Sequence, residues 1–141
     1  VYEDDKLVII NDSKATSPEA SFYALRSVAE NYQSFYKTLI LGGRMIDDNY
    51  KHLNDEINNM DEVYLYGTSR FMLLNKIHHN KIFYFATIEE VIEQITIKSK
   101  HLILFSPSCV SYDQFTSYIQ RGKRFNELIS KFINDKKTIQ K

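Results

Sequence analysis

The stretch "KLVIINDSKATSPEASFYALRSVAENY" (Lys6 to Tyr32) decides the fold class, because it joins an apolar run to an amphipathic helix. Residues 6–10 are apolar almost throughout, which is typical of a strand covered on both faces. Ser17 is a good helix N-cap, and Pro18 suits the first helical turn. One apolar stripe then follows, made of Phe22, Leu25, Val28, Ala29 and Tyr32. The stretch predicts a strand, a polar corner and a crossover helix.

Four further apolar runs of strand length follow along the chain, at residues 37–41, 62–67, 81–86 and 101–106. They do not alternate apolar with polar residues, as expected for strands of a mainly parallel sheet. Strands that alternate with helices predict a three-layer α/β, Rossmann-like domain. We expect five or six strands, with helices on both faces of the sheet.

Helices are expected in the intervals between these runs. Residues 50–59 and 69–78 are expected as crossover helices, and another begins at Thr87, which has capping-box spacing to Glu90. Residues 112–133 are expected as one or two helices broken near Gly122, followed by a frayed tail.

The composition excludes several classes of protein. The chain has 141 residues, 43% of them hydrophobic, which fits one compact domain. Its 18 basic residues balance its 18 acidic residues, so no global field draws in nucleic acid or a membrane surface. The single Cys109 excludes an internal disulfide, and without a signal or transmembrane run the expected compartment is the cytoplasm. Because the chain starts at Val1 and enters a strand almost at once, we expect a fragment of a longer protein.

Three polar loops follow the first, second and fifth apolar runs. Their sequences are "NDSKAT", "GGRMIDD" and "SPSCVSYDQF". Ligands of open α/β sheets bind beyond the carboxyl ends of the strands. We therefore expect these distant segments to meet at one edge of the sheet.

The first loop carries groups suited to a nucleotide or a carboxylate. Asp12 can accept hydrogen bonds from a ribose, Lys14 can place a positive charge on a phosphate or carboxylate, and Thr16 can donate a hydroxyl beside a helix N-terminus. The alternative is an ordinary turn with a capping hydroxyl and a solvated lysine.

The second loop is less specific. Gly42 and Gly43 permit close approach of a ligand, but the third glycine of a dinucleotide fingerprint is missing, which disfavours a Rossmann dehydrogenase. Arg44 can pair with a carboxylate, or it can be a solvated surface arginine.

The third loop is ambiguous in the same way. The Ser111 hydroxyl can cap a helix together with Gln114, or it can face a substrate carboxylate. Cys109 is expected to be a small buried residue rather than a nucleophile. The four histidines lack the spacing of metal ligands, so we expect no protein-bound metal.

Taken together, three segments resemble a known family. "NDSKATSPEA", "LILGG" and "LFSPSCVSYDQFTSYIQRGKRF" are similar, in order and spacing, to the C-terminal domain of the Mur ligases, and the "DSKAT" corner is typical of the branch that adds D-glutamate. The resemblance implies that residues 1–141 are one such domain of a three-domain enzyme. The missing N-terminal domain would bind the UDP-sugar, and the missing central domain would carry the P-loop ATPase. No "GxxxxGK[ST]" motif occurs in this chain.

The resemblance also implies a reaction. ATP and Mg²⁺, bound mainly by the central domain, would activate the carboxylate of UDP-N-acetylmuramoyl-L-alanine as an acyl phosphate. The amine of D-glutamate would then attack it to form an amide during peptidoglycan synthesis. This chain by itself is expected to be inactive.

Several residues acquire roles by the same resemblance. Asp12 would bind the ATP ribose, and Lys14 would act as a catalytic residue near the nucleotide and the reacting groups. Thr16, Ser111 and the backbone of Tyr118 would hold the D-glutamate carboxylates, and Tyr112 would line the pocket.

The second loop departs from the family pattern. Relatives usually place a lysine or arginine a few residues after the glycine pair, where this chain has Met45 and Ile46. We expect Arg44 to supply the missing cation to D-glutamate.

Two alternatives remain open. One is another Mur or folylpolyglutamate-type ligase that takes a different amino acid. The other is a non-catalytic α/β binding module such as a receiver-like domain, although none of the middle strands ends in the aspartate that a receiver needs.

Overall fold

The structure is a computed structural model that describes residues 2–112 and 114–140, with side chains up to residue 135. The strands are β1 (Tyr2–Glu3), β2 (Leu7–Asn11), β3 (Tyr36–Gly42), β4 (Glu62–Tyr66), β5 (Ile82–Phe85) and β6 (His101–Ser108). The helices are α1 (Pro18–Asn31), α2 (Lys51–Ile57), α3 (Arg70–Lys76), α4 (Ile88–Gln94) and α5 (Tyr118–Gln140).

The strands form one sheet in the order β1-β2-β6-β3-β4-β5. All neighbouring pairs are parallel except β1 and β2. The predicted parallel sheet and its five main strands are confirmed. The short β1 was not predicted, because two residues show no periodicity; a turn in which Asp4 accepts from the backbone of Lys6 and Leu7 holds it beside β2.

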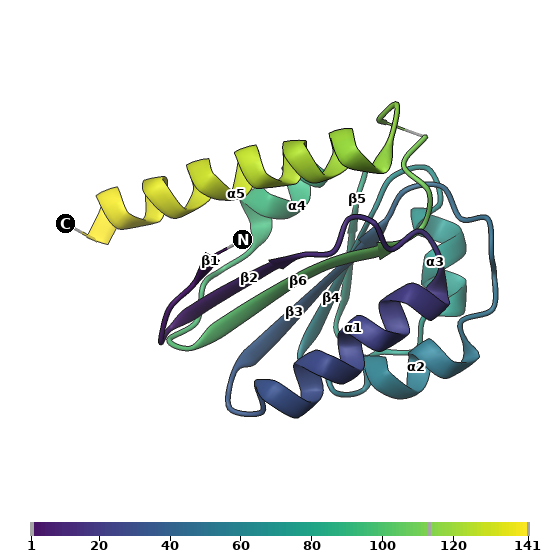
Figure 1. Cartoon of the computed structure of the whole chain (residues 1–141), viewed down its shortest axis with the longest axis horizontal. Helices are drawn as coiled ribbons and strands as arrows, with labels where there is room; N and C mark the ends of the chain where they lie inside the picture. The colour runs from purple at the N-terminus through teal and green to yellow at the C-terminus, as the bar shows by residue number, and fades with distance from the viewer. Residues whose placement is uncertain (1, 113, 141) are drawn as a thin grey trace.

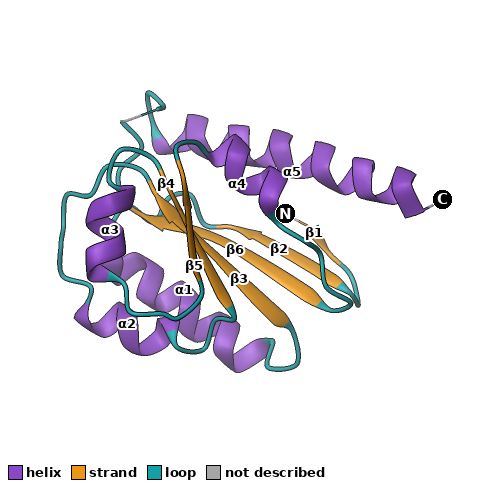
Figure 2. Cartoon of the chain, turned by 180° about the vertical axis from the view of Figure 1, so that it is seen from behind, coloured by secondary structure: helices purple, strands orange, loops and turns teal. Residues whose placement is uncertain are grey.

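The domain has three layers (Figure 1). Helices α1, α2 and α3 cover one face of the sheet, and α4 and α5 cover the other, as Figure 2 shows from behind. Each face has its own core: Leu25 and Leu53 pack under the first group of helices, and Val91, Phe125 and Ile129 pack under the second. The predicted arrangement of helices on both faces is confirmed.

The two predicted helix starts are correct. The Ser17 side chain accepts a hydrogen bond from the Ala20 N–H at the start of α1, and Thr87 accepts one from the Glu90 N–H at the start of α4. Helices α2 and α3 lie within the predicted ranges but are each seven residues long, shorter than expected.

The predicted break near Gly122 is wrong. Helix α5 continues through this residue and extends to Gln140, where a frayed tail was expected. The glycine instead permits close packing, because a Cβ atom at Gly122 would lie 2.3 Å from Ser13 Oγ in the corner after β2. None of the described helices, α5 included, has the length and apolar character needed to cross a membrane.

Of the two roles left open for the Ser111 hydroxyl, the helix cap is not observed. Its carbonyl, rather than its hydroxyl, accepts from the backbone of Gln114 and Phe115, and this forms a turn. Helix α5 begins six residues later than that cap would place it, and there the Ser117 hydroxyl accepts from the Gln120 N–H at 3.2 Å.

Candidate functional site

The three polar loops meet at the carboxyl ends of neighbouring strands, as predicted. Strand β6 lies between β2 and β3, so the loops after these three strands are adjacent. The Asp12 N–H donates to the Phe105 carbonyl at 2.7 Å. Arg44 and Val110 exchange two backbone hydrogen bonds of 2.9 and 3.0 Å. Main-chain bonds therefore fix the corner, the glycine turn and the last loop to one another.

The end of β6 bends to reach this arrangement. The pairing of β6 with β3 shifts register between Ile40 and Gly42, opposite Pro107, which has no N–H to donate to a regular ladder. Ser108 follows in the left-handed region with φ 63°, and its hydroxyl lies 2.8 Å from the buried Tyr50 hydroxyl. The contact with Tyr50 stabilises this unfavourable backbone conformation of Ser108. The chain then crosses the end of β3, where Val110 pairs with Arg44.

Gly43 is needed where the two loops cross. Its φ is 119°, and an added Cβ atom would lie 2.4 Å from the Val110 carbonyl oxygen. Sequence analysis assigned the glycine pair to close approach of a ligand. At Gly43 the group that approaches closely is instead the backbone of Val110.

Asp12 lies in the corner with one side of its carboxylate directed into the protein. Its Oδ2 accepts a hydrogen bond of 2.8 Å from the Ser106 hydroxyl, which lies 2.9 Å from Ser21 Oγ in α1. Burial raises the pKa of the Asp12 carboxyl, and the Ser106 bond and the Lys14 charge partly oppose this shift. The carboxylate is therefore oriented before any ligand arrives.

Lys14 and Thr16 differ from Asp12 in their surroundings. The Lys14 side chain is exposed, and Thr16 is half-buried. Neither side chain makes a hydrogen bond or ion pair within the part of the chain that the structure describes. Both are consequently available to a ligand.

The predicted carboxylate-binding residues come from two places. Arg44 and Tyr112 line one cavity of about 520 Å³ together with residues of α3 and the turn before it. Ser111, next to Tyr112, is buried, and its hydroxyl has no hydrogen bond to another described residue. Tyr118 is the first residue of α5 and is 47% exposed. Tyr118 does not line this cavity.

Sequence analysis missed Arg121, the largest fully buried side chain of the domain among the described residues. Its guanidinium is fully buried and donates to the Cys109 carbonyl and to the Ser13 carbonyl, each at 2.7 Å. It thereby joins α5 to the corner and to the end of β6. The available signal was the 3.6-residue period of the buried face of α5, which Arg121 shares with Phe125 and Ile129.

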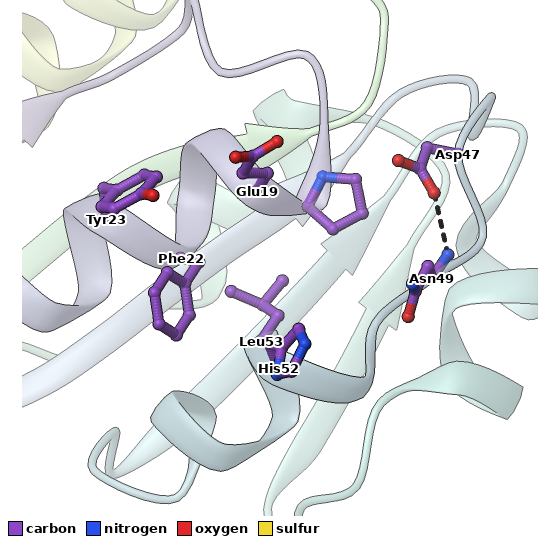
Figure 3. A pocket seen from close by; sticks show the side chains of 8 residues that line it. Glu19, Phe22, Tyr23, Asp47, Asn49, His52 and Leu53 are labelled. Carbon is purple, nitrogen blue, oxygen red and sulfur yellow. Dashed lines mark hydrogen bonds between the residues drawn. The ribbon is translucent and has the colours of Figure 1, made fainter.

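A second cavity, of about 420 Å³, lies between α1 and the segment leading into α2 (Figure 3). Figure 3 shows Glu19 and Tyr23 on α1 facing His52 and Leu53 across it, with Asp47 at the far end. None of the predicted site residues lines this cavity. The site proposed from the sequence therefore lies at the sheet edge and not here.

No three His, Cys, Asp or Glu residues gather closely enough to hold a metal ion among residues 2–112 and 114–140. Cys109 is buried, as predicted, with its sulfur 3.7 Å from the Tyr50 hydroxyl. The chemistry that the described residues offer is thus hydrogen bonding and charge: hydroxyls, one oriented carboxylate and two exposed cations.

Comparison with curated proteins finds close similarity to one enzyme. The chain is 34% identical over 138 residues to the UDP-N-acetylmuramoylalanine–D-glutamate ligase of Buchnera aphidicola subsp. Baizongia pistaciae, covering 95% of this chain and 30% of that protein. It is 36% identical over 136 residues to the ligase of the same name from Fusobacterium nucleatum, covering 89% and 30%. The chain thus spans less than a third of the length of these relatives. No family model matches it.

Solved structures share the fold at lower sequence identity. UDP-N-acetylmuramate-alanine ligase from Thermotoga maritima superposes with a TM-score of 0.66 at 16% identity, over 93% of this chain and 29% of that one. A domain from Haemophilus ducreyi, described as part of a UDP-N-acetylmuramate:L-alanyl-gamma-D-glutamyl-diaminopimelate ligase, gives a TM-score of 0.54 at 13% identity, over 74% of this chain and 81% of that one. At these identities the structures support the fold alone.

Proposed function

Because this chain is related over 95% of its length to D-glutamate-adding Mur ligases, we propose that residues 1–141 form the C-terminal domain of such an enzyme. The full protein would use ATP to join D-glutamate to UDP-N-acetylmuramoyl-L-alanine, in the cytoplasm. The observation that carries the proposal is the convergence of the "DSKAT" corner with the Arg44 turn and the loop after β6. Other domains of the same protein would supply the P-loop, which this sequence lacks.

In this proposal the corner faces the nucleotide. Asp12, oriented by Ser106, would accept hydrogen bonds from the ribose hydroxyls. The exposed ammonium of Lys14 would stabilise negative charge that develops on the phosphate and carboxylate oxygens as the amide forms. By the family resemblance, Mg²⁺, which would neutralise phosphate charge, would be bound mainly by the central domain outside this chain.

The hydroxyls would hold the amino acid. Thr16 and the buried Ser111 each have a hydroxyl without a hydrogen bond to another described residue, so each can donate to a D-glutamate carboxylate. Arg44 would add a bidentate charged pair. Tyr112 and the backbone of Tyr118 complete the set that the family resemblance implies.

The proposal is tested with the full-length protein by measuring D-glutamate-dependent phosphate release from ATP in the presence of UDP-N-acetylmuramoyl-L-alanine. Lys14→Ala should lower kcat about a hundredfold, the effect of losing one preorganised charge contact. Lys6→Ala is the matched control, because Lys6 is also exposed but precedes β2, at the opposite edge. Equal kcat values for the two variants, or no D-glutamate-dependent turnover by the parent protein, would contradict the proposal.

A ligase that takes a different amino acid is the second candidate, and the turn after β3 favours it. By the family resemblance, a cation would be expected where this chain has Met45 and Ile46. Turnover with another amino acid but not with D-glutamate, in the same assay, would select this candidate.

A further inference from the structure

A further cavity, of about 260 Å³, lies near the amino ends of β4 and β5. Its walls come from the start of β4, from the edge strand β5, and from the end of α4 with the loop that leads to β6. The residues that give it its chemistry are Glu62, Tyr64, Lys81, Phe83, Phe85 and Lys98. None of the residues named in the proposed function lines it, because those residues lie at the opposite edge of the sheet.

Glu62 enters this cavity from a buried position. It is 5% exposed, and its Oε1 lies 2.8 Å from Thr38 Oγ1. That hydroxyl lies 2.7 Å from Nε2 of His101, whose Nδ1 accepts the Lys98 N–H at 3.0 Å. Burial lowers the pKa of His101 to about 4, so near pH 7 the ring is neutral and carries its proton on Nε2. Thr38 therefore accepts from the ring and donates its own hydrogen to Glu62, which fixes the carboxylate.

The second oxygen of this carboxylate is an unused acceptor. Glu62 Oε2 has no hydrogen bond to another described residue. The Lys81 ammonium is 3.9 Å from it, which is too far for a hydrogen bond, and donates to the Tyr36 hydroxyl at 2.8 Å. A buried, oriented carboxylate oxygen gains free energy when a ligand N–H donates to it.

Aromatic rings form the wall on the side of β5. The Tyr64 and Phe83 ring centroids are 5.1 Å apart and their planes are inclined by 29°, and the Tyr64 and Phe85 centroids are 6.2 Å apart with planes inclined by 17°. The three rings are thus nearly parallel. Phe83 is 38% exposed, so it offers ring surface to a ligand. A planar ring system suits this wall, because stacked aromatic rings attract one another.

Two lysines decide where charge can lie on the ligand. The Lys81 side chain is 47% exposed, and Lys98 is exposed as well. Both ammonium groups lie 5.5 Å from the centroid of the Tyr36 ring, so they are gathered on one side of the cavity. They would repel a cationic ligand and attract an anionic group. The donor to Glu62 is therefore expected to be a neutral N–H, and an anionic group is expected near the lysines.

The size of the cavity limits what enters it. Its volume is below the range of about 300 to 1,000 Å³ that is usual for small-molecule pockets, so it suits one ring system with the rest of the ligand outside. A planar ring with neighbouring N–H donors and an attached anion describes a guanine nucleotide. Guanine carries N1–H and an amino group on one edge, and both can donate to a carboxylate. Adenine has an acceptor at N1, which a carboxylate repels.

We propose that this cavity binds the base of a guanine nucleotide, with Glu62 accepting from the guanine N–H groups, Phe83 stacking on the base, and Lys81 and Lys98 pairing with the phosphate. This site is separate from the corner after β2, which is at the carboxyl ends of the strands. The inference goes beyond the proposed function and does not depend on it.

The test is a titration of the 141-residue chain with guanosine monophosphate, followed by the amide NMR shifts of Glu62, Phe83 and Lys98. These shifts should saturate. Adenosine monophosphate should bind at least about tenfold more weakly, because it cannot donate from N1 to the carboxylate. Guanosine, which lacks the phosphate, should also bind more weakly, and inorganic phosphate alone should not shift Phe83.

Two neighbouring residues of β5 give a matched pair of variants. Phe83 and Tyr84 are 38% and 50% exposed, but only Phe83 lines the cavity, because consecutive side chains of a strand point to opposite faces. Phe83→Ser should weaken the binding of guanosine monophosphate about tenfold, as expected when stacking on a base is lost. Tyr84→Ser should leave it unchanged. Glu62→Gln keeps an acceptor for Thr38 but presents an amide NH₂, so it should abolish the preference for guanine over adenine.

Equal affinities for the two monophosphates, or no saturating shifts, would overturn the inference. Equal weakening in Phe83→Ser and Tyr84→Ser would do the same, because it would indicate disturbance of the edge strand rather than lost stacking. Shifts of the same size with inorganic phosphate would leave only an anion site at the lysines, and shifts confined to Asp12 and Lys14 would place the nucleotide at the other edge. If Glu62→Gln does not fold, the pair at Phe83 and Tyr84 still decides between these outcomes.

Discussion

At the amino ends of β3, β4 and β6 the polar side chains bond to one another, whereas at the carboxyl ends of β2, β3 and β6 several face outward. At the amino ends, Thr38 Oγ1 lies 2.8 Å from Glu62 Oε1 and 2.7 Å from His101 Nε2, and all three residues are buried. The other His101 nitrogen accepts from the Lys98 N–H at 3.0 Å. This group has few unused donors or acceptors.

The carboxyl ends use bonds differently. Arg121 and the Arg44–Val110 bridge fix the backbone of the loops, and the side chains of Lys14 and Arg44 stay exposed without partners among the described residues. This contrast separates two kinds of polar group in the fold. A polar group whose bonds are all made inside the protein contributes to stability, and one that is held in place with bonds to spare is a candidate for binding.

The largest effect on stability is expected from Arg121, whose side chain holds the loops at the carboxyl edge together. Arg121→Met should lower the free energy of unfolding by about 4 kcal/mol, because a buried carbonyl and a partly buried one each lose a charged donor. Arg124→Met is the control. Arg124 lies on the next turn of α5 and forms partly exposed ion pairs with Glu89 and Glu127. Such pairs stabilise a fold by less than about 1 kcal/mol.

Urea denaturation of both variants measures these changes. If Arg121→Met does not fold, Arg121→Lys, which keeps the charge but has a single donor nitrogen, should fold with reduced stability. Equal losses in the Arg121 and Arg124 variants would show that the carboxyl edge does not depend on the buried guanidinium.

The second effect concerns the amino edge and pH. Burial is the main cause that lowers the pKa of His101, from 6.5 to about 4, while Glu62 and Asp61 oppose the shift and Lys98 adds to it. The unfolded chain therefore binds a proton at higher pH than the folded protein. The contribution of neutral His101 to the free energy of unfolding is fully present above about pH 6.5. It is lost as the pH falls toward 4, and the total loss is about 3 kcal/mol.

Urea denaturation between pH 4 and 7.5 checks this prediction. His101→Gln cannot be protonated, so its stability should fall less steeply over this range than that of the parent protein. Parallel pH profiles for the two proteins would exclude His101 as the titrating group.

The third effect concerns the contact between α5 and the corner. Gly122→Ala should cost about 1 kcal/mol, because its Cβ atom would lie 2.3 Å from Ser13 Oγ and the serine must rotate, while the gain in helix propensity offsets part of this cost. Ser13→Gly removes that oxygen, so the double variant should recover most of the loss in a double-mutant cycle. Additive changes would mean that Gly122 is required for some other reason than this contact.

The smallest effect on stability is expected at Lys14. Lys14→Ala should change the free energy of unfolding by less than about 0.5 kcal/mol, because the side chain is exposed and makes no hydrogen bond or ion pair with another described residue. A larger loss of stability would mean that Lys14 contributes to folding. The carboxyl ends of the strands would then differ less from the amino ends than we infer.

Much of the fold could be predicted from local patterns. The five main strands, the caps at Ser17 and Thr87 and the convergence of the three loops followed from apolar runs, capping residues and the geometry of parallel sheets. These features depend on interactions within a few residues or on rules common to all such sheets, so one sequence suffices.

The site could be predicted only in part. The sequence indicated Asp12, Lys14, Thr16 and Arg44 because their chemistry is visible in the residue types. It could not show that Ser106 orients Asp12 or that Ser69 and Met72 share a cavity with Arg44. Such contacts join residues 24 or more positions apart, and no local pattern records them.

The start of α5 shows where sequence reasoning ends. "SYDQ" at residues 111–114 and "SYIQ" at residues 117–120 offer nearly the same capping signal, and only the second is used. The local free energy of the two caps is similar. The second start lets Arg121 reach the carbonyl of Ser13 in the corner and that of Cys109 just after β6, with Gly122 against Ser13. The sequence alone therefore determined that a helix follows this loop, and tertiary packing decided where it begins, because burial of these side chains outweighs the difference between two equivalent caps.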